Sequence, residues 1–166
     1  NAEISNVGVE DSYFDGAGYA GGICGHGVGI TITNCYSTGE VRSSGSNSYV
    51  GGICGYCISI SDSPVTITNC YNIGEVSGSG GYVGGVCGSS NSNCVISNCY
   101  YLVGMPAGSN TAAQTDMFEC SISQFASGEV AYRLQGEQEG TVWGQTLTGD
   151  NRQYYPVLGG AKVYAT

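Results

Sequence analysis

The sequence has few charged residues, and most of them are acidic. Only 10% of its 166 residues are charged, with four Lys and Arg against thirteen Asp and Glu, which gives a formal net charge of −9. Nucleic-acid binding normally needs clustered Lys and Arg to neutralise phosphates. Anionic membrane surfaces attract basic segments for the same reason. We therefore expect no nucleic-acid partner and no binding to an anionic membrane.

Long apolar runs are also missing. No run approaches the roughly 18 residues that a membrane-spanning helix needs, so we expect no membrane insertion. The chain begins with Asn1 and shows no signal peptide, so any targeting signal is expected to lie outside it.

Catalytic and metal-binding motifs are absent from the sequence as well. There is no G-x-S-x-G nucleophile elbow and no HExxH, and the single histidine, His26, lies between two glycines in an expected turn. The only C-x2-C pair, Cys54 and Cys57, lacks the second ligand pair of a zinc site. The densest acidic group, at residues 10–15, is typical of a solvated acidic surface. We expect no enzyme activity, no cofactor and no metal.

Glycine, by contrast, is abundant. The chain has 29 Gly and only 3 Pro, together with many Ser, Asn, Thr and Val residues. This composition favours short strands joined by tight turns over a bundle of helices. Hydrophobic residues make up 41% of the chain, which is enough for a sizeable core and argues against disorder.

Two sequence blocks recur in a fixed order, about thirty residues apart. The first block reads YAGGICG at 19–25, YVGGICG at 49–55 and YVGGVCG at 82–88. The second reads ITITNCY at 30–36, VTITNCY at 65–71 and CVISNCY at 94–100. Within ITITNCY, strand alternation places Ile30 and Ile32 on one face and Thr31, Thr33 and Cys35 on the other.

One such unit cannot bury its own apolar face, whereas stacked units can. We therefore predict an all-β fold in which residues 1–110 form a short parallel β-solenoid of about three coils, each of ~30 residues. The alternative is an antiparallel β-sandwich. The paired glycines inside the first block predict a corner where backbone must approach its neighbours closely.

Residues 111–166 no longer follow the repeat. Their apolar spacing predicts short helices near 115–134 and a strand pair around the turn at 148–151. We expect this small mixed α/β segment to cap the open end of the solenoid, because unpaired edges and an apolar cross-section need cover. Trp143 is expected in its core, with a sugar-stacking surface as the alternative.

Six of the nine cysteines fall in register between repeats. They predict two inward structural ladders, Cys24, Cys54 and Cys87 in one and Cys35, Cys70 and Cys99 in the other. Cys57 and Cys94 lie between the blocks of adjacent coils and are a possible disulfide. Because nine is odd, at least one thiol is expected to be free or to pair elsewhere.

The succession of YVGGICG, ITNCY and GEV resembles the GLUG motif of bacterial surface proteins over residues 1–110. The tail, with FASGEVAYRLQG at 125–136 and YYPVLGG at 154–160, is similar to the segment that often ends such arrays. One departure is the Cys in each GGIxG block, where the family often has Val. The resemblance implies large, secreted or cell-wall-linked proteins, among them adhesins and non-catalytic parts of immunoglobulin-cleaving metallopeptidases.

These observations together predict an extracellular, non-catalytic adhesion, binding or spacer module attached to adjacent domains of a larger chain. It would present loops such as 55–64 to a host or plant glycan or to a surface protein, with Tyr56 as a possible ligand-binding residue. The alternative is an accessory carbohydrate-binding module of a secreted hydrolase or peptidase.

Overall fold

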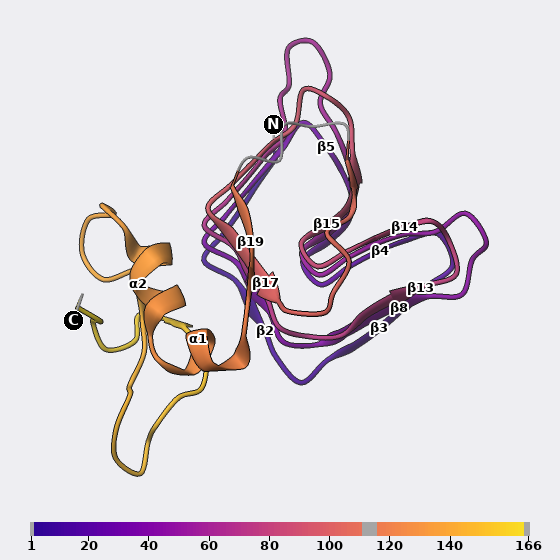
Figure 1. The fold of residues 1–166 in the computed structure, drawn as a ribbon. Coiled ribbons are helices and arrows are strands. Elements are labelled where there is room, and N and C mark those ends of the chain that lie inside the picture. The colour runs from indigo at the N-terminus through magenta and orange to yellow at the C-terminus, as the bar shows by residue number, and fades with distance from the viewer. Residues whose placement is uncertain (1, 111–115, 165–166) are drawn as a thin grey trace.

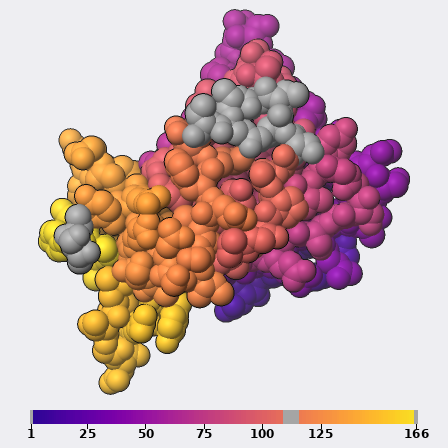
Figure 2. All heavy atoms as spheres, viewed as in Figure 1, coloured from indigo at the N-terminus to yellow at the C-terminus, as the bar shows by residue number. Residues whose placement is uncertain are grey.

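The computed structural model describes residues 2–110 and 116–164, which form a parallel β-solenoid with a small C-terminal lobe (Figures 1 and 2). The predicted all-β solenoid of about three coils is confirmed. Each coil contributes one short strand to each of several parallel sheets, and the strands of one sheet come from successive coils.

Three sheets form the limb of the coil that carries the main core. One stacks β1 (Ala2–Ser5), β6 (Ile30–Thr33), β11 (Thr66–Thr68) and β16 (Val95–Ser97). The second stacks β2 (Gly8–Val9), β7 (Tyr36–Ser37), β12 (Tyr71–Asn72), β17 (Cys99–Leu102) and β19 (Met117–Cys120). The third stacks β5 (Cys24–Val28), β10 (Cys54–Ile58), β15 (Cys87–Ser90) and β18 (Ser109–Asn110).

Two further sheets form a second limb, which projects sideways from the first (Figure 1). One stacks β3 (Tyr13–Gly16), β8 (Glu40–Ser43) and β13 (Val76–Gly78). The other stacks β4 (Tyr19–Gly21), β9 (Tyr49–Gly51) and β14 (Tyr82–Gly84). A small core of Val41, Val50 and their neighbours fills the space between them.

Equivalent residues of the repeats lie directly opposite one another. Ile67 is paired with Ile32 on one side and Ile96 on the other, and all three are buried. Because the repeats match in this register, each inward position becomes a column of like side chains along the solenoid.

An asparagine turns the chain at the same corner of every coil. Asn34, Asn69 and Asn98 have φ between 48° and 55°, in the left-handed region that Asn adopts more readily than most residues. The Asn98 amide donates to Asn69 Oδ1 at 2.7 Å, which links two of these corners. The turn also interrupts strand alternation. Cys35 is therefore fully buried on the inner face, and its predicted placement with Thr31 and Thr33 was wrong.

The paired glycines lie where the two limbs join, and the predicted crowding is present there. A Cβ atom on Gly52 would come within 2.1 Å of the Gly85 carbonyl oxygen and 2.3 Å of the Asn72 side chain. Gly22 and Gly85 face Ser37 and Tyr101 in the same way. The second glycine of each GG pair is needed because the facing strand sends a side chain into the space that a Cβ would occupy.

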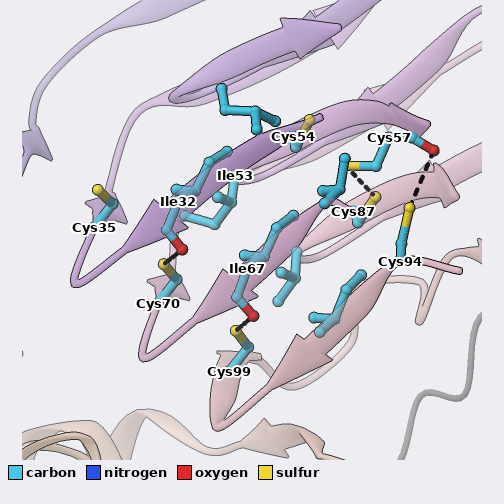
Figure 3. Close-up of a cluster of buried hydrophobic side chains, with 14 of the residues drawn as sticks. Ile32, Cys35, Ile53, Cys54, Cys57, Ile67, Cys70, Cys87, Cys94 and Cys99 are labelled. Atoms are coloured by element: carbon cyan, nitrogen blue, oxygen red, sulfur yellow. Dashed lines mark hydrogen bonds between the residues drawn. The ribbon is translucent and has the colours of Figure 1, made fainter. Parts of the chain in front are cut away.

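Both predicted cysteine ladders are present as columns. Cys54 is paired with Cys24 and with Cys87. Cys35, Cys70 and Cys99 each precede one of three tyrosines that pair in register, and Figure 3 shows these three cysteines at the same place in successive coils. Burial raises the pKa of the Cys70 thiol well above its usual range, so this thiol stays protonated.

The possible Cys57–Cys94 disulfide is not formed, and both residues are free thiols. Cys94 Sγ instead lies within donating distance of two oxygen acceptors, Asn91 Oδ1 at 3.1 Å and the Cys57 carbonyl oxygen at 3.5 Å. The two residues are neighbours, but the Cys94 thiol points toward oxygen acceptors.

The C-terminal lobe contains α1 (Ile122–Ala126), α2 (Glu129–Gln135) and an antiparallel pair of β20 (Trp143–Gly144) and β21 (Val157–Leu158). Ser121 starts α1 with a capping box, and Gly136 ends α2. The predicted boundary at 110/111 borders residues 111–115, which lie outside the described part of the chain. β19 still pairs with β17 of the solenoid, so the lobe begins after Cys120.

We predicted that this lobe would cap the open end of the solenoid. It covers the flank instead (Figure 1). Tyr36, Tyr71 and Tyr100 project from the outer face of their sheet and pack with Phe125 and Trp143 of the lobe. The Tyr71 hydroxyl donates to the Pro156 carbonyl, and Trp143 Nε1 donates to Asn34 Oδ1 at 3.2 Å. An aromatic column running along all coils presents a large apolar surface, and covering it explains the lateral position.

Replacing Gly52 by alanine should lower the free energy of unfolding by about 3 kcal/mol, because the added Cβ overlaps backbone and the buried Asn72. Gly18→Ala is the matched control, since a Cβ there meets nothing within 4 Å. Urea unfolding measures both. Equal midpoints for the two variants would show that the corner is not crowded.

Stability should fall as pH rises from about 10 to 12, because burial raises the pKa of Tyr100 to about 12 and that of Tyr71 well above its usual range. The unfolded chain releases these protons near pH 10, so above that pH it binds fewer protons than the folded chain and is favoured. Urea unfolding at pH 8, 10 and 11 measures the effect. Tyr71→Phe should show a smaller loss, and an unchanged pH dependence in this variant would contradict the assignment.

Candidate functional site

A second column of tyrosines lies on the exposed side of the solenoid. Tyr19, Tyr49 and Tyr82 open the three copies of the first block and pair in register at the starts of β4, β9 and β14. Tyr19 is 48% exposed and Tyr82 39% exposed, whereas Tyr49 between them is half-buried. This column, unlike that of Tyr36, Tyr71 and Tyr100, is not covered by the C-terminal lobe.

A shorter column faces it from the adjoining sheet. His26 on β5 is paired with Tyr56 on β10, and Ser89 takes the equivalent position on β15. The coil bends sharply between the β4/β9/β14 sheet and the β5/β10/β15 sheet, so that their outer faces approach each other (Figure 1). The five rings of Tyr19, His26, Tyr49, Tyr56 and Tyr82 gather at this bend, and we call them the aromatic cluster.

The rings of the aromatic cluster are stacked on one another. The Tyr49 and Tyr82 ring centroids are 4.4 Å apart with an interplanar angle of 6°. Tyr19 and His26 are 4.7 Å apart at 17°, and Tyr49 and Tyr56 are 4.6 Å apart at 31°. Because neighbouring rings cover part of each other's faces, the cluster offers solvent its outermost ring faces, its ring edges and its hydroxyl groups.

The chemistry of the cluster is neutral and amphipathic. None of its side chains is a carboxylate, Lys or Arg. Partial desolvation and the neighbouring phenols of Tyr82, Tyr56 and Tyr19 raise the pKa of Tyr49, which keeps its hydroxyl protonated. Protonated phenols both donate and accept hydrogen bonds, and their rings offer apolar contact. Such a surface suits a ligand that combines apolar C–H groups with many hydroxyls.

Tyr56, the residue proposed from the sequence, belongs to this cluster. The loop proposed with it, residues 55–64, begins inside strand β10, so that only the part after Ile58 forms a turn. That turn is tied to the next coil, because Asn91 donates to the Ser59 carbonyl at 2.7 Å and accepts from the Ser59 amide at 2.9 Å. The candidate binding site is therefore the aromatic cluster at the bend and not the loop.

His26 was interpreted from the sequence as a residue of a turn, and that interpretation was wrong. It lies within β5 and stacks on Tyr19 and on Tyr56. A signal was available in the spacing, because Tyr19 to His26 and Tyr49 to Tyr56 are the same distance apart in the chain. Pairing of these positions across a bend could not be inferred without knowing where the coil turns.

The acidic residues near the N-terminus form local contacts. Glu10 accepts a hydrogen bond from the Tyr36 hydroxyl at 2.6 Å, and Asp15 pairs with Arg42 at 3.6 Å. Across residues 2–110 and 116–164, no group of three or more His, Cys, Asp or Glu side chains is arranged to hold a metal ion. No helix in that same part of the chain is long and apolar enough to span a membrane.

Comparison with known proteins gives two matches. Residues 16–42, which run from β3 to β8, match the GLUG motif. The chain carries a GLUG repeat region. No curated protein sequence matches it. The fold is similar to the crystal structure of a Bacteroides ovatus protein provisionally named an immunoglobulin A1 protease, with a TM-score of 0.65 and 21% identity.

That alignment includes 95% of this chain but only 57% of the other, so the GLUG repeats and the C-terminal lobe correspond to part of a longer protein. At this level of identity the likeness concerns the fold. It shows that coils and lobe occur together in a known structure, and the aromatic cluster has to be interpreted from the residues of this chain.

The stacked rings of Tyr49 and Tyr82 should stabilise the fold together. A double-mutant cycle with Tyr49→Ala and Tyr82→Ala should give a coupling free energy of about 0.5–1.5 kcal/mol, because each substitution removes the other's stacking partner. Pairing Tyr49→Ala with Tyr132→Ala, on the exposed side of α2, should give additive effects. Urea unfolding measures both cycles, and additivity in the first would contradict stacking.

Proposed function

We propose that this GLUG repeat region is a non-catalytic module that binds neutral carbohydrate through the aromatic cluster. The observation that carries the proposal is the gathering of four tyrosines and one histidine, with Tyr19, Tyr82 and His26 exposed, at the bend between two sheets. Single exposed aromatic residues are common on protein surfaces, but exposed aromatic residues that are grouped together commonly mark binding sites.

A sugar ring matches this surface chemically. Its C–H groups can pack against the accessible faces and edges of the rings, and its hydroxyls can exchange hydrogen bonds with the phenols. The net charge of −9 disfavours sialylated, sulfated or otherwise anionic glycans. An uncharged oligosaccharide or polysaccharide is therefore the proposed ligand class.

The rigid scaffold also supports binding over chemistry. The rings start strands or lie within them, so their positions are fixed by the backbone ladder and not by a mobile loop. No carboxylate belongs to the cluster, whereas most glycosidases use a pair of them.

We further propose an extracellular location and a larger parent protein in which this module attaches a neighbouring domain to a glycan-bearing surface. The GLUG match and the likeness to part of a longer, provisionally named protease support this context. Whether the neighbouring domain is an adhesin or a hydrolase, the module would hold that domain close to the carbohydrate.

The test is a glycan array that displays neutral and anionic glycans, followed by affinity measurements on the glycans that bind. Tyr49→Ala and Tyr82→Ala should each weaken binding about tenfold or more, as expected for aromatic residues that a ligand contacts directly. Tyr132→Ala is the matched control, because this exposed tyrosine lies on α2, outside the cluster.

Retained binding in the Tyr49 and Tyr82 variants would place the ligand elsewhere on the molecule. Absence of binding to any glycan by the unmodified chain would reject the proposed function, as would turnover of a bound polysaccharide.

A further inference from the structure

Five cysteines line one part of the buried core between coils. They are Cys24, Cys54, Cys57, Cys87 and Cys94. Cys57 and Cys87 come from adjacent coils, and both are fully buried. Their sulfur atoms are 3.6 Å apart, although the residues are 30 positions apart in the chain (Figure 3).

The thiols of the two ladders and of Cys94 contact nearby oxygen acceptors. Cys54 Sγ donates to the Tyr56 carbonyl oxygen at 3.5 Å, although Cys54 is the register partner of Cys87. Cys94 Sγ donates to Asn91 and accepts a hydrogen bond from the Ser59 hydroxyl at 3.4 Å. In the other ladder, Cys70 Sγ donates to the Thr68 carbonyl oxygen at 3.2 Å. The Cys87 thiol makes the same kind of contact with the Ser89 carbonyl oxygen, at 3.2 Å, and in addition lies 3.6 Å from the sulfur of Cys57.

We propose that Cys57 and Cys87 are a site of oxidative cross-linking that closes one complete coil of the solenoid. In the reaction, a small-molecule disulfide such as oxidised glutathione accepts two electrons and two protons from the pair. An S–S bond forms between Cys57 and Cys87, the S–S bond of glutathione breaks, and two glutathione thiols leave. Cys57 lies opposite Ser90 in the ladder, so the bond runs diagonally between the coils, and its formation brings the sulfurs from 3.6 Å to about 2.05 Å.

Burial determines when the reaction takes place. Thiol–disulfide exchange requires access of the oxidant to a thiolate, and a fully buried thiol offers neither access nor thiolate. The cross-link is therefore formed while the coils that contain β10 and β15 assemble, and the folded core then protects it from reduction.

The position of the bond relates it to the aromatic cluster. Tyr56 directly precedes Cys57, and the closed loop contains Tyr82. The cross-link fastens the strand that carries Tyr56 to the coil that carries Tyr82. It stabilises the fold by restricting the unfolded chain, independently of any ligand.

The experiment is to refold the reduced, denatured chain with and without a mixture of reduced and oxidised glutathione, and then to alkylate the remaining thiols under denaturing conditions. With glutathione we expect a chain lighter by two hydrogen atoms before alkylation, with seven alkylated cysteines instead of the nine that the sequence contains. The melting temperature should rise by about 5 °C or more and return after reduction.

Chymotryptic mapping without reduction identifies the pair, because cleavage after Tyr56 separates Cys54 from Cys57. Fragment spectra then distinguish Cys87 from Cys94. Cys57→Ala and Cys87→Ala should each abolish the cross-link, and Cys94→Ala should retain it. A bond between Cys57 and Cys94, any other pair, or nine alkylated cysteines after folding with glutathione would overturn the proposal. Mapping of the unmodified chain decides the question even if a variant fails to fold.

Discussion

The whole structure depends on one constraint, which is that successive coils hydrogen-bond to one another in a fixed register. The amide of each strand finds its acceptor in the neighbouring coil, as when the Tyr71 amide donates to the Cys35 carbonyl and the Tyr100 amide donates to the Cys70 carbonyl. This ladder places equivalent residues of the repeats in columns, several of which consist of one residue type. A slip of one residue would turn the isoleucine columns outward and bring the threonines into the core.

The columns differ in what covers them, and this decides their roles. Isoleucine and cysteine columns fill the interior, and the tyrosine column of the second block is covered by the C-terminal lobe. The tyrosine column of the first block stays open beside His26 and Tyr56. The crowded glycine corners place the two limbs at the angle that brings these rings together. Core, lobe and proposed binding surface therefore follow from the same stacking.

Much of the fold could be predicted because aligning the repeated blocks shows which residues of successive coils lie opposite one another. Block spacing predicted parallel coils, and the fixed places of cysteine and glycine predicted inward columns and a crowded corner. Two features could not be obtained in this way. The left-handed conformation of Asn34 reverses strand alternation, which an alternation rule cannot anticipate. The lobe lies on the flank because the column of Tyr36 points outward from its sheet. That direction can be predicted only when the path of the coil is known. The aromatic cluster was found only in part, through Tyr56, for the same reason.

The edge pairing described for the coils has a consequence for how such molecules grow. Each unit brings its own partner groups on both sides, so duplication of one unit lengthens the molecule by about 4.8 Å without any new interface. The same duplication adds one more ring to the exposed column. Copy number in the gene would thus set the valency of the surface, and avidity for a polymeric ligand could increase without a single change in the contact residues.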